Sequence, residues 1–169
     1  MQQKCGTYFW DILLKLYKSL VRPILDYSVQ AWRPYLQKDI DVLERVQRRA
    51  TRMVEGCEGM YYRRRLLELQ LTTLETRRER ADMIEVFKIC KGLEGVKEED
   101  FFVRQKGSTR ANEFKIFKKR LNLDLAKYSF GNRVINNWNK LPNSVVQATS
   151  VDAFKGRLDK FMGATWGLI

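Results

Sequence analysis

The N-terminal part of the chain places apolar residues at the spacing of amphipathic helices. In segment 8–21, apolar side chains recur three or four positions apart, while Lys15 and Lys18 fall on the opposite face. Pro23 predicts that this helix ends or kinks there, because proline lacks a backbone N–H. A second helical piece is predicted to run on to Trp32, before the next proline breaks the chain.

The next predicted helix, over about residues 38–55, carries two separate stripes. An apolar stripe, expected to face the core, consists of Val42, Leu43, Val46, Ala50, Met53 and Val54. A second stripe lies about 120° away at about 100° per residue. It consists of Arg45, Arg48, Arg49 and Arg52, at i, i+3, i+4 and i+7. Gly56 stands where a C-terminal cap is expected.

Further helices follow. A short one is predicted over Tyr61–Leu69, and Thr72-Thr73-Leu74-Glu75 forms a T-x-x-E capping box that opens a long helix. This helix ends near Gly92, and its second half is apolar nearly all round, so we expect several elements to pack against it. It is therefore the predicted central helix.

The C-terminal part is less regular. Phe114–Phe117 is predicted to form a short strand paired with Leu121–Leu125. Two helices are expected to close the chain, from about residue 129 to 140, with Trp138 in the core, and after a cap at Thr149-Ser150-Val151-Asp152. We therefore expect an all-α fold with at most one small hairpin.

These patterns also suggest a domain organisation. We expect a helical region over residues 1–92 and a basic helical extension over residues 114–169. The intervening residues 93–113 are acidic, then polar and turn-rich, and are interpreted as a linker or a mobile loop.

The net positive charge of the chain indicates an anionic partner. The 169 residues include 32 Lys and Arg against 20 Asp and Glu, which gives a formal net charge of +12. A surplus of this size on a small chain attracts phosphate backbones or anionic membranes. No apolar run approaches the roughly 18–20 residues that a spanning helix needs, and the N-terminus does not resemble a secretion signal. We expect a protein of the nucleus or cytoplasm that does not enter a membrane.

Residues for catalysis or metal binding are scarce. The sequence has no histidine, which removes the commonest general base and zinc ligand. Cys5, Cys57 and Cys90 are far apart and are predicted to be free thiols in a reducing compartment. Asp39 and Asp41 open a helix, whose N-terminal dipole explains them without a metal. We therefore predict no catalytic residue, metal or cofactor.

The basic clusters are the main functional signal. Arginines on one helix face can follow a phosphate backbone, because each guanidinium offers paired hydrogen bonds to phosphate oxygens. The alternative is a solvated face balanced by nearby acids. Four clusters of one sign favour nucleic acid, and Arg77, Arg78 and Arg80 form one of them. The predicted contacts are Arg45, Arg48, Arg49 and Arg52, then Arg63, Arg64 and Arg65, with Lys118, Lys119 and Arg120 as a second site.

Several motifs, in order along about residues 13–162, together resemble one family. They are LYKSLVRP at 16–23, LDY at 25–27, AW at 31–32, LERVQRRAT at 43–51, LTTLETRR at 71–78, FGNRVIN at 130–136, WN at 138–139, LP at 141–142, FK at 154–155 and LD at 158–159. This pattern resembles the region after the palm in non-LTR retrotransposon reverse transcriptases, of the CR1/jockey-like LINE elements.

The resemblance implies a polymerase thumb followed by a C-terminal RNA- or DNA-binding extension. A thumb grips the primer–template duplex through its backbone, so RNA or DNA is the implied partner. Fingers, the palm with its metal-binding aspartates and the endonuclease of such elements have no counterpart here, so no activity is expected of the chain alone. Met1–Asp11 matches the family poorly and is interpreted as a new start created by truncation.

Three alternatives remain open. The chain could be part of an RNA-directed DNA polymerase that works only with its missing palm. It could be a helical protein-interaction module, which an apolar patch left open around the first helix would favour. It could also be a remnant without a function, which would unfold non-cooperatively. The sequence does not predict the oligomeric state.

Overall fold

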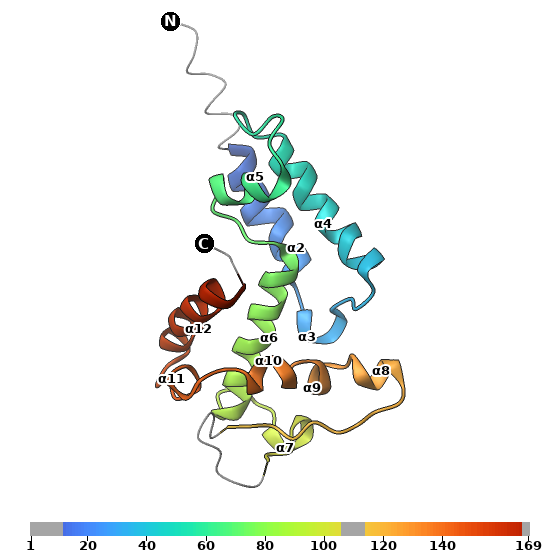
Figure 1. Ribbon diagram of the computed structural model, residues 1–169, viewed down its shortest axis with the longest axis vertical. Coiled ribbons are helices and arrows are strands. Elements are labelled where there is room, and N and C mark those ends of the chain that lie inside the picture. The colour runs from blue at the N-terminus through green and yellow to red at the C-terminus, as the bar shows by residue number, and fades with distance from the viewer. Residues whose placement is uncertain (1–11, 106–113, 167–169) are drawn as a thin grey trace, which may run out of the picture. The chain divides into compact units, whose positions relative to one another are not determined.

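The computed structural model describes residues 12–105 and 114–166, with side chains described up to Gly163 (Figure 1). The described residues are mostly helical, which confirms the all-α fold class. The chain divides into two compact units, Met1–Arg78 and Glu79–Ile169. The boundary therefore falls inside one long helix and not within residues 93–113.

The first helix runs from residue 12 to residue 26 and passes through Pro23. It is α-helical over residues 12–16, widens into a π-helical turn, η1 (Tyr17–Val21), and continues as α2 (Arg22–Asp26). The N–H of Arg22 bonds to the carbonyl of Tyr17, five residues back. Proline would otherwise clash with the carbonyl four residues before it, so the wider turn lets the helix continue where the sequence predicts an end or a kink.

Four further elements complete unit 1: α3 (Val29–Trp32), α4 (Gln37–Arg52), α5 (Tyr62–Glu68) and the first turn of α6 (Leu74–Cys90). Thr73 caps α6, because its Oγ1 accepts the Thr76 N–H at 3.1 Å. Thr76 also shares a 2.9 Å hydrogen bond with the Thr73 hydroxyl. The expected box of Thr72 and Glu75 is thus shifted by one residue.

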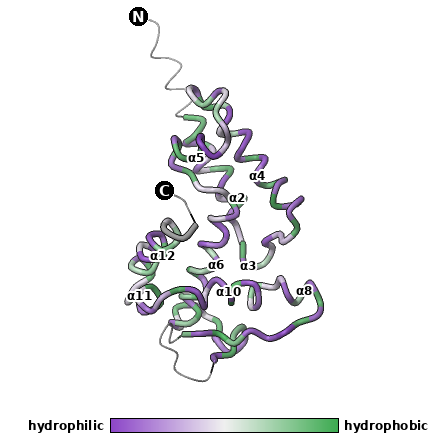
Figure 2. The backbone as a smooth tube through the Cα atoms, in the orientation of Figure 1, coloured by the Kyte–Doolittle hydropathy of each residue, from purple (hydrophilic) through white to green (hydrophobic). Residues whose placement is uncertain are grey.

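The buried face of α4 is polar, opposite to the prediction. Glu44, Gln47 and Thr51 are the buried residues of α4. Of the predicted apolar stripe, Val54 is buried and Leu43 and Ala50 are half-buried. The others, Val42, Val46 and Met53, are exposed. Hydrophobic residues recur along α4 (Figure 2), but their spacing does not mark the side that faces the core.

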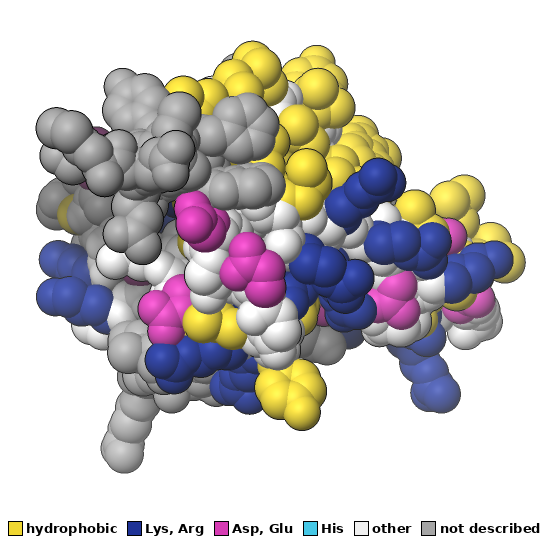
Figure 3. Space-filling view, turned by 90° about the horizontal axis from the view of Figure 1, so that it is seen from above, with side chains coloured by type: hydrophobic (Ala, Val, Ile, Leu, Met, Phe, Trp, Pro, Cys, Tyr) yellow, Lys and Arg dark blue, Asp and Glu magenta, His cyan; other side chains and the backbone are white. Residues whose placement is uncertain are grey.

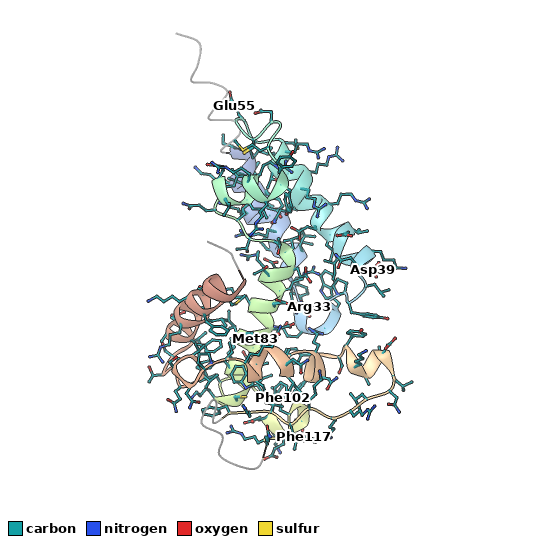
Figure 4. The ribbon with its side chains drawn as sticks, viewed as in Figure 1. Arg33, Asp39, Glu55, Met83, Phe102 and Phe117 are labelled. Atoms are coloured by element: carbon teal, nitrogen blue, oxygen red, sulfur yellow. The ribbon has the colours of Figure 1, made fainter. Side chains whose placement is uncertain are left out.

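Unit 2 is built around the second half of α6, as predicted. Phe87 of α6 stacks on Phe154 with ring centroids 4.2 Å apart, and Trp138 lies 6.1 Å from Phe154. Met83 of α6 and Phe102 belong to the same core (Figure 4). The helices around it are α7 (Glu98–Phe101), α8 (Asp124–Lys127), α9 (Phe130–Arg133), α10 (Ile135–Asn139), α11 (Asn143–Val146) and α12 (Val151–Trp166). Phe102 is 4% exposed, so the described part of the expected linker is integral to this core.

The predicted strand at Phe114–Phe117 pairs with a different segment. An antiparallel bridge joins Ile116 to Arg104 rather than to Leu121–Leu125. The Phe117 N–H bonds to Val103 O at 2.7 Å. On its other edge, the backbone of Ile116 is bonded by the side chain of Asn139, at 3.0 and 2.8 Å. Because an asparagine takes the place of a neighbouring strand, the pairing does not extend into a hairpin with Leu121–Leu125.

Candidate nucleic-acid interface

A buried hydrogen-bond network fixes the orientation of α4. Gln47 is at its centre: its Oε1 accepts from Tyr17 Oη at 2.8 Å. Its Nε2 donates to Tyr62 Oη and to the carbonyl of Thr72, both at 2.9 Å. One amide therefore joins the first helix, α4, α5 and the segment before α6. Buried polar groups must be paired in this way to avoid a large desolvation penalty.

Glu44 adds a buried charge to this network. Its Oε2 accepts the backbone N–H of Leu74 at 2.9 Å, in the first turn of α6, and its Oε1 accepts the Tyr62 hydroxyl. The positive end of the α6 dipole stabilises a carboxylate at this position. Burial raises the pKa of Tyr62, and its hydrogen bond to Glu44 raises it further. Burial is also the main cause of the raised pKa of Tyr17.

With the polar face of α4 held inward, its arginine stripe faces solvent. Arg45, Arg48, Arg49 and Arg52 are all exposed. Within residues 12–105 and 114–166, none of the four is paired with a carboxylate. Arg48 lies over the ring of Tyr62, with Cζ 5.0 Å from the centroid. In the described part of the chain, none of the neighbouring acids Asp41, Glu44 and Glu55 forms an ion pair with this stripe.

The α5 cluster is divided by the fold. Arg65 is 4% exposed and donates to the Thr51 hydroxyl at 3.3 Å and to the carbonyl of Met60. Because its guanidinium is buried, Arg65 cannot contact a nucleic acid and is removed from the predicted contacts. Arg64 is exposed and pairs with Glu68 at 2.6 Å. Arg63 is exposed on the same short helix.

The third cluster, Arg77, Arg78 and Arg80, makes contacts within the protein. The Arg77 guanidinium donates two hydrogen bonds to one carboxylate oxygen of Asp26, at 2.7 and 2.9 Å. Arg78 is buried and lies over the ring of Trp32, with Cζ 4.5 Å from the centroid. Arg80 forms a two-pronged pair with Asp159. These contacts therefore do not support counting this cluster as a signal for nucleic acid.

The second predicted site lies in unit 2. Lys118, Lys119 and Arg120 are exposed, in the segment between Phe117 and α8. Lys119 also lines an open pocket of about 390 Å³, whose rim carries Glu99 and Asp100. This cluster belongs to unit 2 and the α4 stripe to unit 1. Figure 3 shows Lys and Arg side chains gathered beside exposed hydrophobic ones.

The described residues offer little for covalent or metal chemistry. Among them, no group of three or more His, Cys, Asp or Glu side chains could hold a metal ion. Burial raises the pKa of the Cys90 thiol to about 12 and also raises the pKa of Cys57. Thiols in this state are poor nucleophiles at neutral pH. No described helix is both long and apolar enough to cross a membrane.

Two features that position the basic face were not predicted from the sequence. One is Tyr62, whose ring centroid lies 5.0 Å from Cζ of Arg48 and 5.5 Å from Cζ of Arg65. A tyrosine directly before three arginines was the available signal for it. The other is the polar triplet of α4, which has helical spacing but resembles an ordinary solvated face. Met1–Asp11, including Cys5, lies outside the described residues.

Comparison with known proteins found no match: no family model, curated protein or solved structure is similar to this chain.

Proposed function

We propose that the protein binds the sugar–phosphate backbone of RNA or DNA through the arginine stripe of α4. The observation that carries this proposal is the set of four exposed arginines on one helix face, none paired with a carboxylate in the described part of the chain. The buried Glu44 and Gln47 network supports it, because it holds that face at a fixed orientation. An ordered set of cations loses less entropy on binding than a mobile one.

The length of the stripe suits a phosphate backbone. From Arg45 to Arg52 the helix rises about 10 Å. At about 3.4 Å per phosphate along one strand of a duplex, this spans about three phosphates. Such contacts position nucleic acid without reading its sequence. This is the sequence-indifferent grip that the resemblance to a reverse transcriptase thumb implies, and non-catalytic binding is the role that we propose for the chain alone.

The test compares a charge reversal in the stripe with the same reversal elsewhere. Arg48→Glu with Arg49→Glu should weaken binding to labelled RNA and DNA duplexes about tenfold or more. It should also make the dependence of log K on log salt shallower by about two, since each lost phosphate contact removes about 0.9 from the slope. Fluorescence anisotropy across a salt series measures both quantities, and circular dichroism should show unchanged helicity.

The matched control is Lys140→Glu with Lys160→Glu, two exposed lysines of unit 2. It changes the net charge by the same amount but leaves the stripe intact. If both double variants lose affinity equally, net charge rather than a site on α4 accounts for binding, and the proposal fails. A wild-type chain with no salt-dependent affinity for either duplex would also reject it.

A second role, as a protein-interaction module, is favoured by an apolar groove left open beside the first helix.

A further inference from the structure

An open groove of about 400 Å³ runs between the first helix and α4 in unit 1. Its lining is apolar except for one arginine and one tyrosine: Leu13, Leu16, Tyr17, Leu20, Val21, Val46, Arg49, Ala50 and Met53. Leu20 is 60% exposed, Met53 46% and Val46 40%. Soluble proteins rarely leave contiguous apolar side chains in water unless these form a binding surface.

The groove follows from the sidedness of α4. Because Glu44, Gln47 and Thr51 occupy the buried face, the apolar residues Val42, Val46 and Met53 are left exposed. The first helix continues the patch, since its own exposed residues include Leu16 and Leu20, four positions apart. The polar network and other apolar side chains, such as Val29, Leu66 and Leu74, fill the interior of unit 1, so the apolar residues of the groove stay at the surface.

The shape of the groove fits a helix. Two parallel rows of apolar side chains, one on each of two neighbouring helices, form the hollow into which a third helix packs its own row. On the α4 side the groove runs from Val46 to Met53, the residue that follows the helix, which corresponds to about 10 Å of helix rise, or about two turns. A lipid surface or a flat partner would not need a concave site.

The charge along the groove indicates the character of the occupant. Arg49 lines the groove, and Arg45 and Arg52 lie on the same stripe of α4, four residues before it and three after it. Among the residues that the structure describes, no carboxylate lines this groove. A second copy of the chain, with a formal charge of +12, would bring like charges together. An occupant with acidic flanks would instead pair with the arginines.

We propose that this groove binds an amphipathic, acid-flanked helix of a partner protein. The apolar face of that helix would cover Leu16, Leu20, Val46 and Met53, and its glutamates or aspartates would pair with the bordering arginines. This site is distinct from the phosphate-binding role of α4, although Arg49 borders both. An occupied groove and a bound nucleic acid would therefore influence each other through that one side chain.

The experiment uses two designed helical peptides of about 15 residues, labelled for fluorescence anisotropy. Both carry leucines at i, i+3, i+4 and i+7, and the flanking positions are glutamate in one and lysine in the other. The glutamate peptide should bind about tenfold more tightly or better. Leu20→Gln and Val46→Gln should each weaken it about tenfold, since each removes a central apolar contact. Both positions are exposed, so folding should be unaffected.

The control is Leu125→Gln, which changes an 87% exposed leucine of unit 2 and should leave peptide binding unchanged. Arg49→Glu should narrow the difference between the two peptides. Leu20→Gln retains all the arginines, so this variant should still bind the nucleic-acid duplex. Loss of peptide binding with intact duplex binding would therefore separate this proposal from the phosphate-binding one.

Three results would overturn the proposal. One is equal binding of the two peptides. Another is a concentration-dependent dimer in sedimentation that Val46→Gln abolishes, which would assign the groove to a second copy. The third is binding to phosphatidylserine vesicles that Leu20→Gln and Val46→Gln remove, which would assign it to lipid.

Discussion

A carboxylate, an amide and two phenols share the interior of unit 1. Glu44 and Gln47 of α4 bond to Tyr17 and Tyr62 and reach backbone groups at the start of α6. Each of these groups would be costly to bury alone, and together they are stable only in one register. Specificity in this unit therefore depends strongly on polar contacts, with apolar side chains such as Val29 and Leu74 filling the space around them.

Replacing Glu44 tests this network. Glu44→Ala removes the acceptor of the Leu74 N–H and of the Tyr62 hydroxyl, so we expect the free energy of unfolding to fall by about 2–4 kcal/mol. Urea denaturation followed by circular dichroism measures it. The control, Glu55→Ala at an exposed site, should change it by about 0.5 kcal/mol or less. Equal losses in the two variants would contradict a stabilising role for the buried carboxylate.

The two buried phenols predict a loss of stability at alkaline pH. In the unfolded chain a tyrosine ionises near pH 10, whereas burial raises the pKa of Tyr17 and Tyr62 in the fold. The unfolded state thus releases these protons first, and stability falls as pH rises above about 10, by up to about 1.4 kcal/mol per pH unit for each group. Tyr17→Phe should flatten this dependence in denaturant titrations at increasing pH. The exposed Tyr61→Phe should not, and if it flattens the dependence equally, the assignment is wrong.

At the scale of elements, periodicity predicts that a helix forms better than it predicts which side is buried. α4 lies within three residues of its expected bounds, yet it presents three stripes, polar, basic and apolar, each with helical spacing. Which face of α4 is buried depends on the groups that pack against it, and these are Tyr17, Tyr62 and the Thr72 carbonyl. The strand at Phe114–Phe117 shows the same limit, because a side chain distant in sequence, Asn139, fixed its second edge.

In unit 2, one ion pair joins α6 to α9. Asp82 is fully buried, and its two carboxylate oxygens accept from Arg133 at 3.0 and 3.1 Å. Asp82→Ala leaves a largely buried guanidinium without this partner, so stability should fall by about 3–5 kcal/mol.

Two further variants sharpen this test. Asp82→Leu with Arg133→Met should recover much of the loss, because an apolar pair removes the buried charge. The exposed pair of Asp152 and Lys155 is the comparison, and Asp152→Ala should cost about 1 kcal/mol or less. Chemical denaturation gives each value. If Asp82→Ala costs no more than Asp152→Ala, the pair is not structural.

At the scale of the whole molecule, the sequence was sufficient for the all-α class, the central α6 and the candidate arginine stripe. The sequence could not distinguish arginines and lysines that face solvent from those that form contacts inside the fold. Arg48 and Arg78 look alike in the sequence, but Arg48 is exposed while Arg78 is buried over Trp32. The difference depends on contacts between residues far apart in the chain, which local spacing does not encode.

The two basic sites should act additively on nucleic-acid affinity. Neutralising Lys118, Lys119 and Arg120 to glutamine should weaken duplex binding less than reversing Arg48 and Arg49, because neutralisation adds no repulsion. Since the sites belong to different compact units, we expect the free-energy changes to sum within about 0.5 kcal/mol. Anisotropy titrations of the two variants and their combination measure this. A combined effect far from the sum would indicate that the sites are coupled.

The boundary between the units has a practical consequence for dissection of the protein. It falls after Arg78, in the interior of α6, where there is no loop to cut. A fragment that stops there would lose most of a helix whose first turn is anchored by Glu44, and the complementary fragment would begin in mid-helix without its Thr73 cap. Separate expression of the halves therefore calls for overlapping pieces that each retain Leu74–Cys90 in full.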